Sequence, residues 1–440
     1  MTQSDCCKMS KNVIPASRGA GSRYAGKVGI ISLGCPRNLV DSEGILGRLT
    51  AKGYKIVDIQ DADVGLVNTC SFIDQAKKES VDAILDLVEL KKEGRLKKII
   101  VAGCLSQRYK AGLLSRLPEV DAFVGRLEFE DSLSYKKYPL TAGHTGYLKI
   151  SEGCNHSCSF CVIPKIKGRL KSRATESIIE EVKGWDEEKK AEINIIGQDI
   201  GMYGLDIDKK LTLSSLLTKI IGVLNNVRWL RLLYLYPENL TPDLIRLIAE
   251  EPRICKYVDL PLQHINRRVL KAMKRPYNKK KILRMLSVLR GKIPTAAIRT
   301  SLIVGFPGET DKEFKELVSF VKEQRFQRLG VFRYSREEGT AAYEYPHQVP
   351  EKIKKERFDL IMREQRVISE ENNREFLGKT LEVLIDEKES EGNYIGRLSI
   401  DAPEVDQAVS VKSRKPLSIG SFIKAKIIDT REYDLAAEAV

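Results

Sequence analysis

A cysteine recurs at the end of each predicted strand near the amino terminus of this 440-residue chain. These strand-end cysteines are Cys35, Cys70 and Cys104. Each closes a short apolar run that is typical of a buried strand, and the runs lie at residues 27–33, 63–67 and 97–102. Helical patterns at 41–52 and 74–90 separate the runs, and strands alternating with helices predict a parallel sheet.

Because the carboxyl ends of parallel strands share one edge of a sheet, we expect the strand-end cysteines to meet there. Their separations of 35 and 34 residues each equal one strand–helix unit. Free cysteine is among the most buried residue types, so three unrelated buried thiols are the simpler explanation. The repeated position favours instead an iron–sulfur cluster that is held by three cysteines and keeps one iron without a protein ligand.

A second set of three cysteines, Cys154, Cys158 and Cys161, forms a short cysteine loop directly after an apolar run at 147–151. Such a loop directs three thiolates toward one point, as an iron–sulfur cluster requires. Three ligands leave one iron of a four-iron cluster open, and an open metal position is a place for chemistry. The alternatives are a structural zinc loop or buried thiols, but His156 is poorly placed to supply the fourth ligand of a zinc site.

Residues 141–370 predict a partial barrel of strand–helix units. Its predicted strands are residues 147–151, 192–196, 229–235, 257–261, 297–304 and 329–334. Helical patterns at 175–186, 211–221 and 311–324 lie between strands. In a barrel of this kind, the loops at the carboxyl ends of the strands build the site.

Glycine and polar residues at these strand ends are candidate contacts for a small molecule. Gly305, Gly308 and Glu309 follow one strand, where glycines allow a planar ligand to approach the backbone, although an ordinary turn has the same pattern. Gln198 and His264 follow two other strands and are candidates for binding polar groups.

Cations stand at every second position just after the cysteine loop. They are Lys165, Lys167, Arg169, Lys171 and Arg173. On an extended segment they would line one side, either as a solvated face or as a guide for an anionic substrate.

The last unit, residues 371–440, follows a charged helix at 350–375 and changes character. Short strand patterns at 381–385, 394–398, 408–411 and 422–428 are typical of a small β-barrel. Between residues 376 and 440, nine Lys or Arg stand against twelve Asp or Glu, although the whole chain carries a net charge of +14. The last unit is therefore acidic, and the basic surplus lies before it.

Composition limits the class of protein and its compartment. No apolar run approaches the roughly 20 residues that a membrane span requires, so we expect no membrane partner. Nine cysteines, mostly clustered, indicate metal binding in the reducing cytoplasm and not a disulfide framework. The chain is predicted to be α/β, with a flexible tail at 1–26 and units at 27–140, 141–370 and 371–440.

From about residue 27 to 440, the chain resembles the methylthiotransferase family of the radical S-adenosylmethionine (SAM) superfamily. The spacing C-x3-C-x2-C of the cysteine loop, with Phe160 before its last cysteine, is similar to the superfamily motif. Further similar segments are residues 32–43, 162–164, 334–335, 339–340 and 401–404. The resemblance implies an amino-terminal parallel α/β domain with an auxiliary cluster, a partial radical SAM barrel with six strand–helix units and a carboxy-terminal TRAM β-barrel.

The resemblance also implies two four-iron clusters and SAM as cofactors. The cysteine loop would hold the cluster that cleaves SAM to a 5′-deoxyadenosyl radical, and the strand-end cysteines would hold an auxiliary cluster that carries the sulfur. A second SAM would methylate that sulfur, and an electron donor such as flavodoxin or ferredoxin would supply the reducing electron. The residues expected to contact SAM are Phe160, Gln198, Gly305, Gly308 and Glu309.

Within the family, the motifs are most similar to members that modify the β-carbon of an aspartate in ribosomal protein S-twelve of the small ribosomal subunit. Pro36-Arg37 stands where members that modify an adenosine in tRNA usually have Gln-Met or a similar pair. The acidic last unit favours the same substrate, because ribosomal proteins are basic and a tRNA-binding unit should carry Lys and Arg for phosphates. tRNA is the alternative substrate, and a non-catalytic iron–sulfur protein that binds RNA or acts as a sensor would leave the cysteine loop unexplained.

Overall fold

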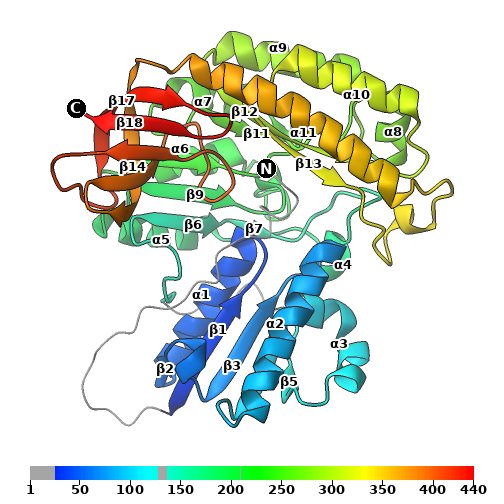
Figure 1. Cartoon of the computed structure of the whole chain (residues 1–440), viewed down its shortest axis with the longest axis vertical. Helices are drawn as coiled ribbons and strands as arrows, with labels where there is room; N and C mark the ends of the chain where they lie inside the picture. The colour runs from blue at the N-terminus through cyan, green and yellow to red at the C-terminus, as the bar shows by residue number, and fades with distance from the viewer. Residues whose placement is uncertain (1–24, 127–135, 209) are drawn as a thin grey trace.

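The computed structural model describes residues 25–126, 136–208 and 210–440. Residues 1–24 of the predicted tail at 1–26 therefore lie outside the described residues. The described residues form a parallel sheet, a partial barrel and a small closed barrel, which confirms the predicted α/β class (Figure 1).

The amino-terminal sheet is parallel throughout, in the order β2-β1-β3-β4-β5. Its strands are β1 (Gly26–Ser32), β2 (Tyr54–Ile56), β3 (Val64–Thr69), β4 (Lys98–Gly103) and β5 (Ala122–Phe123). Its helices are α1 (Pro36–Ala51), α2 (Asp74–Lys92) and α3 (Cys104–Arg116). α1 begins at Pro36, well before the predicted start at residue 41, because proline in the first turn of a helix loses no hydrogen bond.

The partial barrel consists of two parallel three-stranded sheets, β10-β9-β6 and β11-β12-β13. An isolated parallel bridge between Leu230 and Ile254 joins them, so β6 and β13 are the two edge strands. The strands are β6 (Thr145–Lys149), β9 (Glu192–Ile196), β10 (Trp229–Leu232), β11 (Tyr257–Asp259), β12 (Ala297–Val304) and β13 (Arg328–Arg333). β7 (Ser151–Glu152), α4 (Ile163–Lys167) and β8 (Lys171–Ser172) surround the cysteine loop.

Seven helices cover the outside of the barrel (Figure 1). They are α5 (Thr175–Glu187), α6 (Leu213–Ile221), α7 (Pro242–Glu250), α8 (Arg267–Ala272), α9 (Lys279–Lys292), α10 (Asp311–Gln324) and α11 (Glu351–Arg374). Alternate strand residues such as Ile193 and Ile195 pack against them in the largest core. Their neighbours Glu192 and Asn194 therefore face the interior of the barrel, which we call the lumen.

The carboxy-terminal unit is a closed five-stranded barrel in the order β14-β15-β16-β18-β17. Its strands are β14 (Thr380–Ser390), β15 (Asn393–Arg397), β16 (Val409–Lys412), β17 (Phe422–Thr430) and β18 (Leu435–Ala439). β18 has no β-branched residue, so the sequence pattern does not reveal it.

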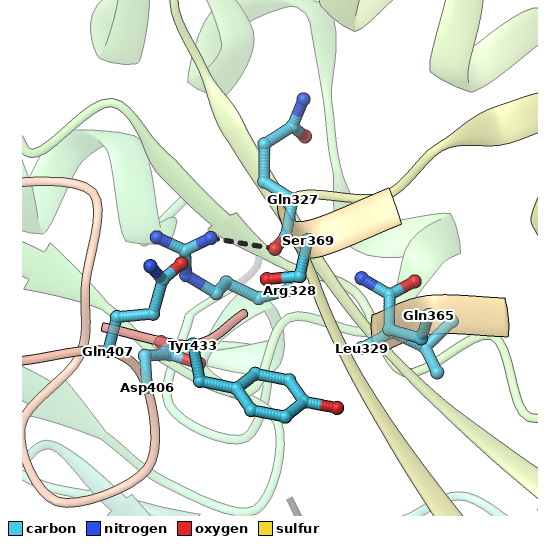
Figure 2. A pocket seen from close by; sticks show the side chains of 8 residues that line it. All are labelled: Gln327, Arg328, Leu329, Gln365, Ser369, Asp406, Gln407 and Tyr433. Carbon is cyan, nitrogen blue, oxygen red and sulfur yellow. Dashed lines mark hydrogen bonds between the residues drawn. The ribbon is translucent and has the colours of Figure 1, made fainter. Parts of the chain in front are cut away.

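A small cavity of about 40 Å³ lies where this barrel meets β13 and α11 (Figure 2). Gln327, Gln365 and Gln407 line it, among others, and both polar side-chain atoms of Gln407 lack a partner among the described residues. The volume suits one or two water molecules. Because the cavity lies at the amino-terminal end of β13, it is remote from the strand ends where the site was predicted.

The prediction of an extended cationic face at residues 165–173 is wrong. Pro164 lies in the first turn of the helix α4, and only Lys171 and Ser172 are extended. Lys167 and Arg173 are 5 % and 6 % exposed and form buried ion pairs, so they do not line a solvated face.

Glu313 closes the start of α10 in a capping box with Thr310, and Arg268 pairs with the same carboxylate. Burial alone would raise the pKa of Glu313, but the hydrogen bonds from Arg268 and Thr310 lower it to about 2. We expect Glu313→Gln to lower the free energy of unfolding by about 1–3 kcal/mol at pH 7. The deficit should shrink as the pH falls from about 4.5 toward 2, because the wild-type protein then loses the same charge.

Chemical denaturation of the cluster-free protein across this pH range tests the prediction. The exposed Glu323→Gln on the same helix is the matched control and should leave stability unchanged. A deficit of equal size at pH 3 and pH 7 would contradict a role for the charge of Glu313.

Candidate active site

The structure places the strand-end cysteines at the carboxyl ends of three adjacent parallel strands, β1, β3 and β4. Cys35 is the N-cap residue of α1, Cys70 directly follows β3, and Cys104 is the first residue of α3. Gly34 lets two of these loops touch, because a Cβ there would lie 3.0 Å from Cys70 Sγ. The charge of Cys35 also acts on the pKa of Cys104, so the three thiols share one edge of the sheet.

Buried polar side chains fix the loops that carry these cysteines. Asn38 donates from Nδ2 to the carbonyl of Leu33 at 2.6 Å, and Asn68 donates to the carbonyl of Asn38 at 2.8 Å. Thr69 donates to the carbonyl of Ala102 at 2.6 Å. All three polar side chains are at most 3 % exposed, so the edge is preorganised by its own hydrogen bonds.

The cysteine loop is shaped by its own backbone. Cys154 N donates to the carbonyl of Gly168 at 3.1 Å, and Cys161 N donates to a carbonyl three residues earlier at 3.1 Å. Gly153 begins the loop with φ +77°, and a Cβ there would lie 2.0 Å from the carbonyl oxygen of Arg169. Only glycine fits this start, which fixes the direction in which the loop leaves β7.

Burial is the dominant influence on the pKa of three of these six thiols. It raises the pKa of Cys154 to about 11, of Cys161 to about 12 and of Cys104 to about 11. Burial acts on Cys35 in the same direction, but Arg37, which donates from Nε to its Sγ at 3.3 Å, outweighs it and lowers the pKa. Thiolates are the metal ligands, so metal loading must remove protons from the first three thiols.

The two sets of cysteines are neighbours in space. Cys104 packs with Val162 and Ile166, which directly follow the cysteine loop, and Figure 1 shows α4 between the sheet and the barrel. Among the described residues, no three His, Cys, Asp or Glu side chains lie close enough to hold a single metal ion. Each thiolate of an iron–sulfur cluster binds a different iron, so cluster ligands need not converge on one ion.

A buried ion cluster joins the sheet to the edge strand β6, and we call it the first clamp. Asp41 of α1 pairs with Lys149 of β6 and with Lys167 of α4, the latter at 2.9 Å. Glu152 lies 2.7 Å from Lys167 and 3.5 Å from Lys149. The four side chains are at most 7 % exposed, and Arg126 approaches Glu152 at 3.8 Å, so both carboxylates are paired with cations inside the protein.

A second clamp joins the sheet to the other edge strand, β13. Glu337, in the loop after β13, accepts from Arg108 of α3 at 2.7 Å and from Lys77 of α2 at 3.1 Å. Ser335 donates to the same carboxylate at 2.7 Å. The edge of the sheet that carries the strand-end cysteines is therefore held against both edge strands of the open barrel, β6 and β13.

Arg37 reaches from the sheet into the barrel. Its Nη1 donates to the carbonyl of Gly197 at 3.0 Å, and its guanidinium lies 4.4 Å from the centroid of the Tyr234 ring. One side chain thus contacts a cysteine of the sheet and a strand-end loop of the barrel.

A buried guanidinium faces the cysteine loop. Arg275 lies 4.4 Å from the ring centroid of Tyr236 and 5.7 Å from that of Phe160, and the charge of Cys158 acts on its pKa. Its Nε and Nη1 are buried and have no hydrogen-bond partner among the described residues. A buried cation with unsatisfied donors is costly, so the geometry fits an anionic ligand group beside Phe160.

Other buried polar atoms in the barrel also lack partners among the described residues. They include both side-chain polar atoms of Asn194 and Gln198 Oε1, whereas His264 Nε2 lies 3.9 Å from Glu309 Oε2. Burial lowers the pKa of His264 to about 4, so its ring is neutral near pH 7, and Nδ1 accepts from Asn266 N at 2.9 Å. The unpartnered atoms of Asn194 and Gln198 fit a polar cofactor or substrate in the lumen.

The loop after β12 that carries Gly305, Gly308 and Glu309 is fixed by hydrogen bonds within the loop. Gly305 and Gly308 have φ of +71° and +76°, and Gly305 N donates to Glu309 Oε2 at 2.8 Å. Burial raises the pKa of Glu309 to about 7, although Arg357, 2.9 Å from Oε1, acts in the opposite direction. The carboxylate is therefore engaged within the chain. Gly305 is buried, and the Lys354 side chain occupies the space where its Cβ would lie, so the half-buried Gly308 is the glycine of this loop that a ligand can approach.

Comparisons with known proteins match the chain in three consecutive stretches. The models of the uncharacterized protein family UPF0004, the radical SAM superfamily and the TRAM domain match residues 27–125, 148–321 and 377–440. Relatives in Clostridioides difficile and a Thermoanaerobacter species, both named ribosomal protein uS12 methylthiotransferase RimO, are 43 % and 45 % identical. The alignments cover 94 % and 93 % of this chain and 99 % of each relative. The chain belongs to the RimO family of methylthiotransferases.

The same fold occurs in a solved structure outside the RimO family. The radical SAM methyltransferase TsrM from Kitasatospora setae has a TM-score of 0.50 and 13 % sequence identity, over 71 % of this chain and 75 % of that protein. Within the described part of the RimO-family chain, no helix has the length and apolar character to cross a membrane.

Three residues of the site were not found by sequence reasoning. Arg37 stood out only as part of a family motif, and Arg275 and Asn194 carried no signal of their own. Each is revealed by what surrounds it: a cysteine sulfur for Arg37, and the lack of any partner for buried polar atoms of the other two.

Proposed function

We propose that this protein transfers a methylthio group to the β-carbon of an aspartate in ribosomal protein uS12. The supporting observation is the meeting of two three-cysteine sets at the contact between the sheet and the radical SAM barrel, where Cys104 packs against Val162 and Ile166. A single set would suffice for radical chemistry on SAM, whereas a second set provides the place for a sulfur-carrying cluster. Membership of the RimO family gives the reaction its class, transfer of a sulfur-containing group.

The cysteine loop would hold one four-iron cluster, and the strand-end cysteines would hold the auxiliary one. When bound, these clusters and SAM supply the radical, the sulfur and the methyl group. Arg275 offers two unpartnered donors to an anionic group such as the SAM carboxylate, and the half-buried backbone of Gly308 is available to its adenine. Arg37 donates to the sulfur of Cys35 and fixes this edge of the sheet against Gly197. The two clamps position the sheet over the barrel, which preorganises the site.

Charge supports a protein substrate over tRNA. The unit that begins at Phe376 carries nine Lys or Arg against twelve Asp or Glu. A unit with a net negative charge complements a basic ribosomal protein and repels a phosphate backbone. We therefore propose uS12, free or in the small ribosomal subunit, as the partner. We also propose flavodoxin or ferredoxin as the electron donor and the cytoplasm as the compartment.

Mass spectrometry of a deletion strain tests this function. We expect uS12 to lose the mass of one methylthio group at a single aspartate, with tRNA nucleosides unchanged and the mark restored by the wild-type gene. A methylthio nucleoside that disappears from tRNA while uS12 keeps its mass would assign the protein to tRNA instead.

Arg275→Met should weaken SAM binding without loss of the clusters. Methionine fills the space between Tyr236 and Phe160 but removes the cation, so we expect SAM affinity to fall about tenfold or more. Equilibrium dialysis with SAM and the iron content of the reconstituted protein provide the two readouts. Unchanged SAM affinity would show that the unpaired donors of Arg275 serve another ligand. The exposed Arg414→Met is the control.

A further inference from the structure

A loop of the carboxy-terminal barrel reaches into the lumen from the end opposite the cysteine loop. It joins β15 to β16 and spans residues 398–408. Ala402 in this loop is 1 % exposed and belongs to the same core cluster as Tyr147 and Tyr257 of the barrel. Tyr257 is the first residue of β11, so the loop packs against the amino-terminal ends of the strands.

Buried carboxylates anchor the loop on both sides of its tip. Asp401 accepts from Arg328 Nε at 2.7 Å, and Asp406 accepts from the hydroxyl of Tyr257 at 2.6 Å. Asp406 also accepts from Ala402 N at 2.9 Å. The tip between them is held by these anchors, and its own side chain is free for another use.

The tip residue Glu404 has a strained backbone. Its φ is +67°, in the left-handed region that side chains other than Gly and Asn rarely adopt. Tyr234 and Gln263, at the ends of barrel strands, share this conformation with φ of +68° each. Strained residues persist where the surrounding structure enforces them, and they concentrate at functional sites.

The carboxylate of Glu404 has no structural partner among the described residues. Its side chain is exposed, and the described residues provide neither a hydrogen bond nor an ion pair to it. Surrounding protein nevertheless raises its pKa, and its charge contributes to raising the pKa of Tyr147. Glu404 is therefore an exposed carboxylate at the tip of a loop whose Ala402 packs in one core cluster with Tyr147.

We propose that Glu404 is a specificity-determining residue that accepts hydrogen bonds from a Lys or Arg side chain of the peptide segment that carries the target aspartate. This inference rests on the proposed function. The open side of the barrel lies between the edge strands β6 and β13, and Glu404 acts on the pKa of Tyr147 of β6, so a segment that enters the lumen from this side passes Glu404. Arg397 acts on the pKa of this carboxylate but forms its ion pairs with Glu192 and Asp386, so Glu404 can still attract a cationic side chain and repel a nucleic-acid phosphate.

The test uses full-length reconstituted protein and a synthetic uS12 peptide that contains the target aspartate. Glu404→Asn removes the charge and suits the left-handed backbone, so we expect an unchanged or raised thermal midpoint and a KM for the peptide about tenfold higher, with kcat changed less. Glu389→Gln removes an exposed carboxylate elsewhere on the same barrel and is the matched control. Peptides in which each Lys or Arg is replaced in turn by norleucine identify the partner.

The proposal predicts that one of these replacements weakens binding to the wild-type protein but has little further effect on Glu404→Asn. It is overturned if Glu404→Asn binds the peptide as tightly as Glu389→Gln does, or if its loss of binding follows a lowered thermal midpoint that Glu404→Gly shares. A wild-type protein that neither binds nor modifies the peptide overturns the proposed function and this inference with it.

Discussion

Cys35→Ala is expected to remove one of the two clusters and to abolish methylthio transfer while SAM cleavage continues. Cys35 is the N-cap residue of α1 but makes no side-chain capping bond, so its replacement should leave the fold intact. The cysteine loop belongs to a separate segment and keeps all of its thiols. We expect iron in the reconstituted protein to fall from about eight to about four atoms per chain, with 5′-deoxyadenosine still formed and methylthio product reduced below detection.

Cys255→Ala is the matched control for this experiment. Cys255 is 3 % exposed in the barrel core, and burial raises the pKa of its thiol to about 11, so it is an inert structural cysteine. This variant should keep both clusters and the full activity. If Cys35→Ala also lost SAM cleavage, the division of work between the two cysteine sets would be wrong.

The position of the strand-end cysteines was predictable because parallel strands impose it. An apolar run, a helix and a repeat of this unit place each strand terminus at the same edge of the sheet, whatever the loops contain. Short strands such as β2 and β5, with three and two residues, show no such periodicity and were missed. The class of fold was therefore predictable from local patterns, but the complete order of the sheet was not.

The contacts between the units were not predictable, because their partners lie far apart in the sequence. Asp41 and Lys149 are 108 residues apart, and Arg37 and Gly197 are 160 residues apart. The burial of some of the cations at 165–173 was not predictable for the same reason. Their alternation indicated one extended cationic face, either solvated or a guide for an anionic substrate, but Lys167 is buried because Asp41 and Glu152 compensate its charge. Charge pattern alone does not distinguish a solvated cation from one paired in the interior.

Asp41→Asn is expected to separate SAM cleavage from methylthio transfer. The change leaves Lys149 and Lys167 buried with Glu152 as their remaining carboxylate in the first clamp. Removal of one partner from a buried ion pair costs about 3–5 kcal/mol, which is enough to loosen the contact between the sheet and β6. Because the sheet carries the auxiliary cysteines, its displacement should misplace the sulfur relative to the radical. We expect the ratio of 5′-deoxyadenosine to methylthio product to rise at least about tenfold, since small misplacements in preorganised sites have effects of this size or larger.

The double variant Asp41→Asn/Lys149→Met separates stability from positioning. It removes one of the two buried cations that lost Asp41, while Lys167 keeps its pair with Glu152 at 2.7 Å, and should recover most of the lost stability. It does not restore the link between α1 and β6, so the excess of cleavage over transfer should persist. Asp61→Asn, at an exposed position of the same unit, is the control and should match the wild-type protein.

Pulsed electron paramagnetic resonance of the reduced clusters gives an independent readout, with a broader distribution of distances expected in both Asp41 variants. If Asp41→Asn keeps the wild-type ratio of products and the wild-type distance, the first clamp stabilises the fold but does not position the clusters.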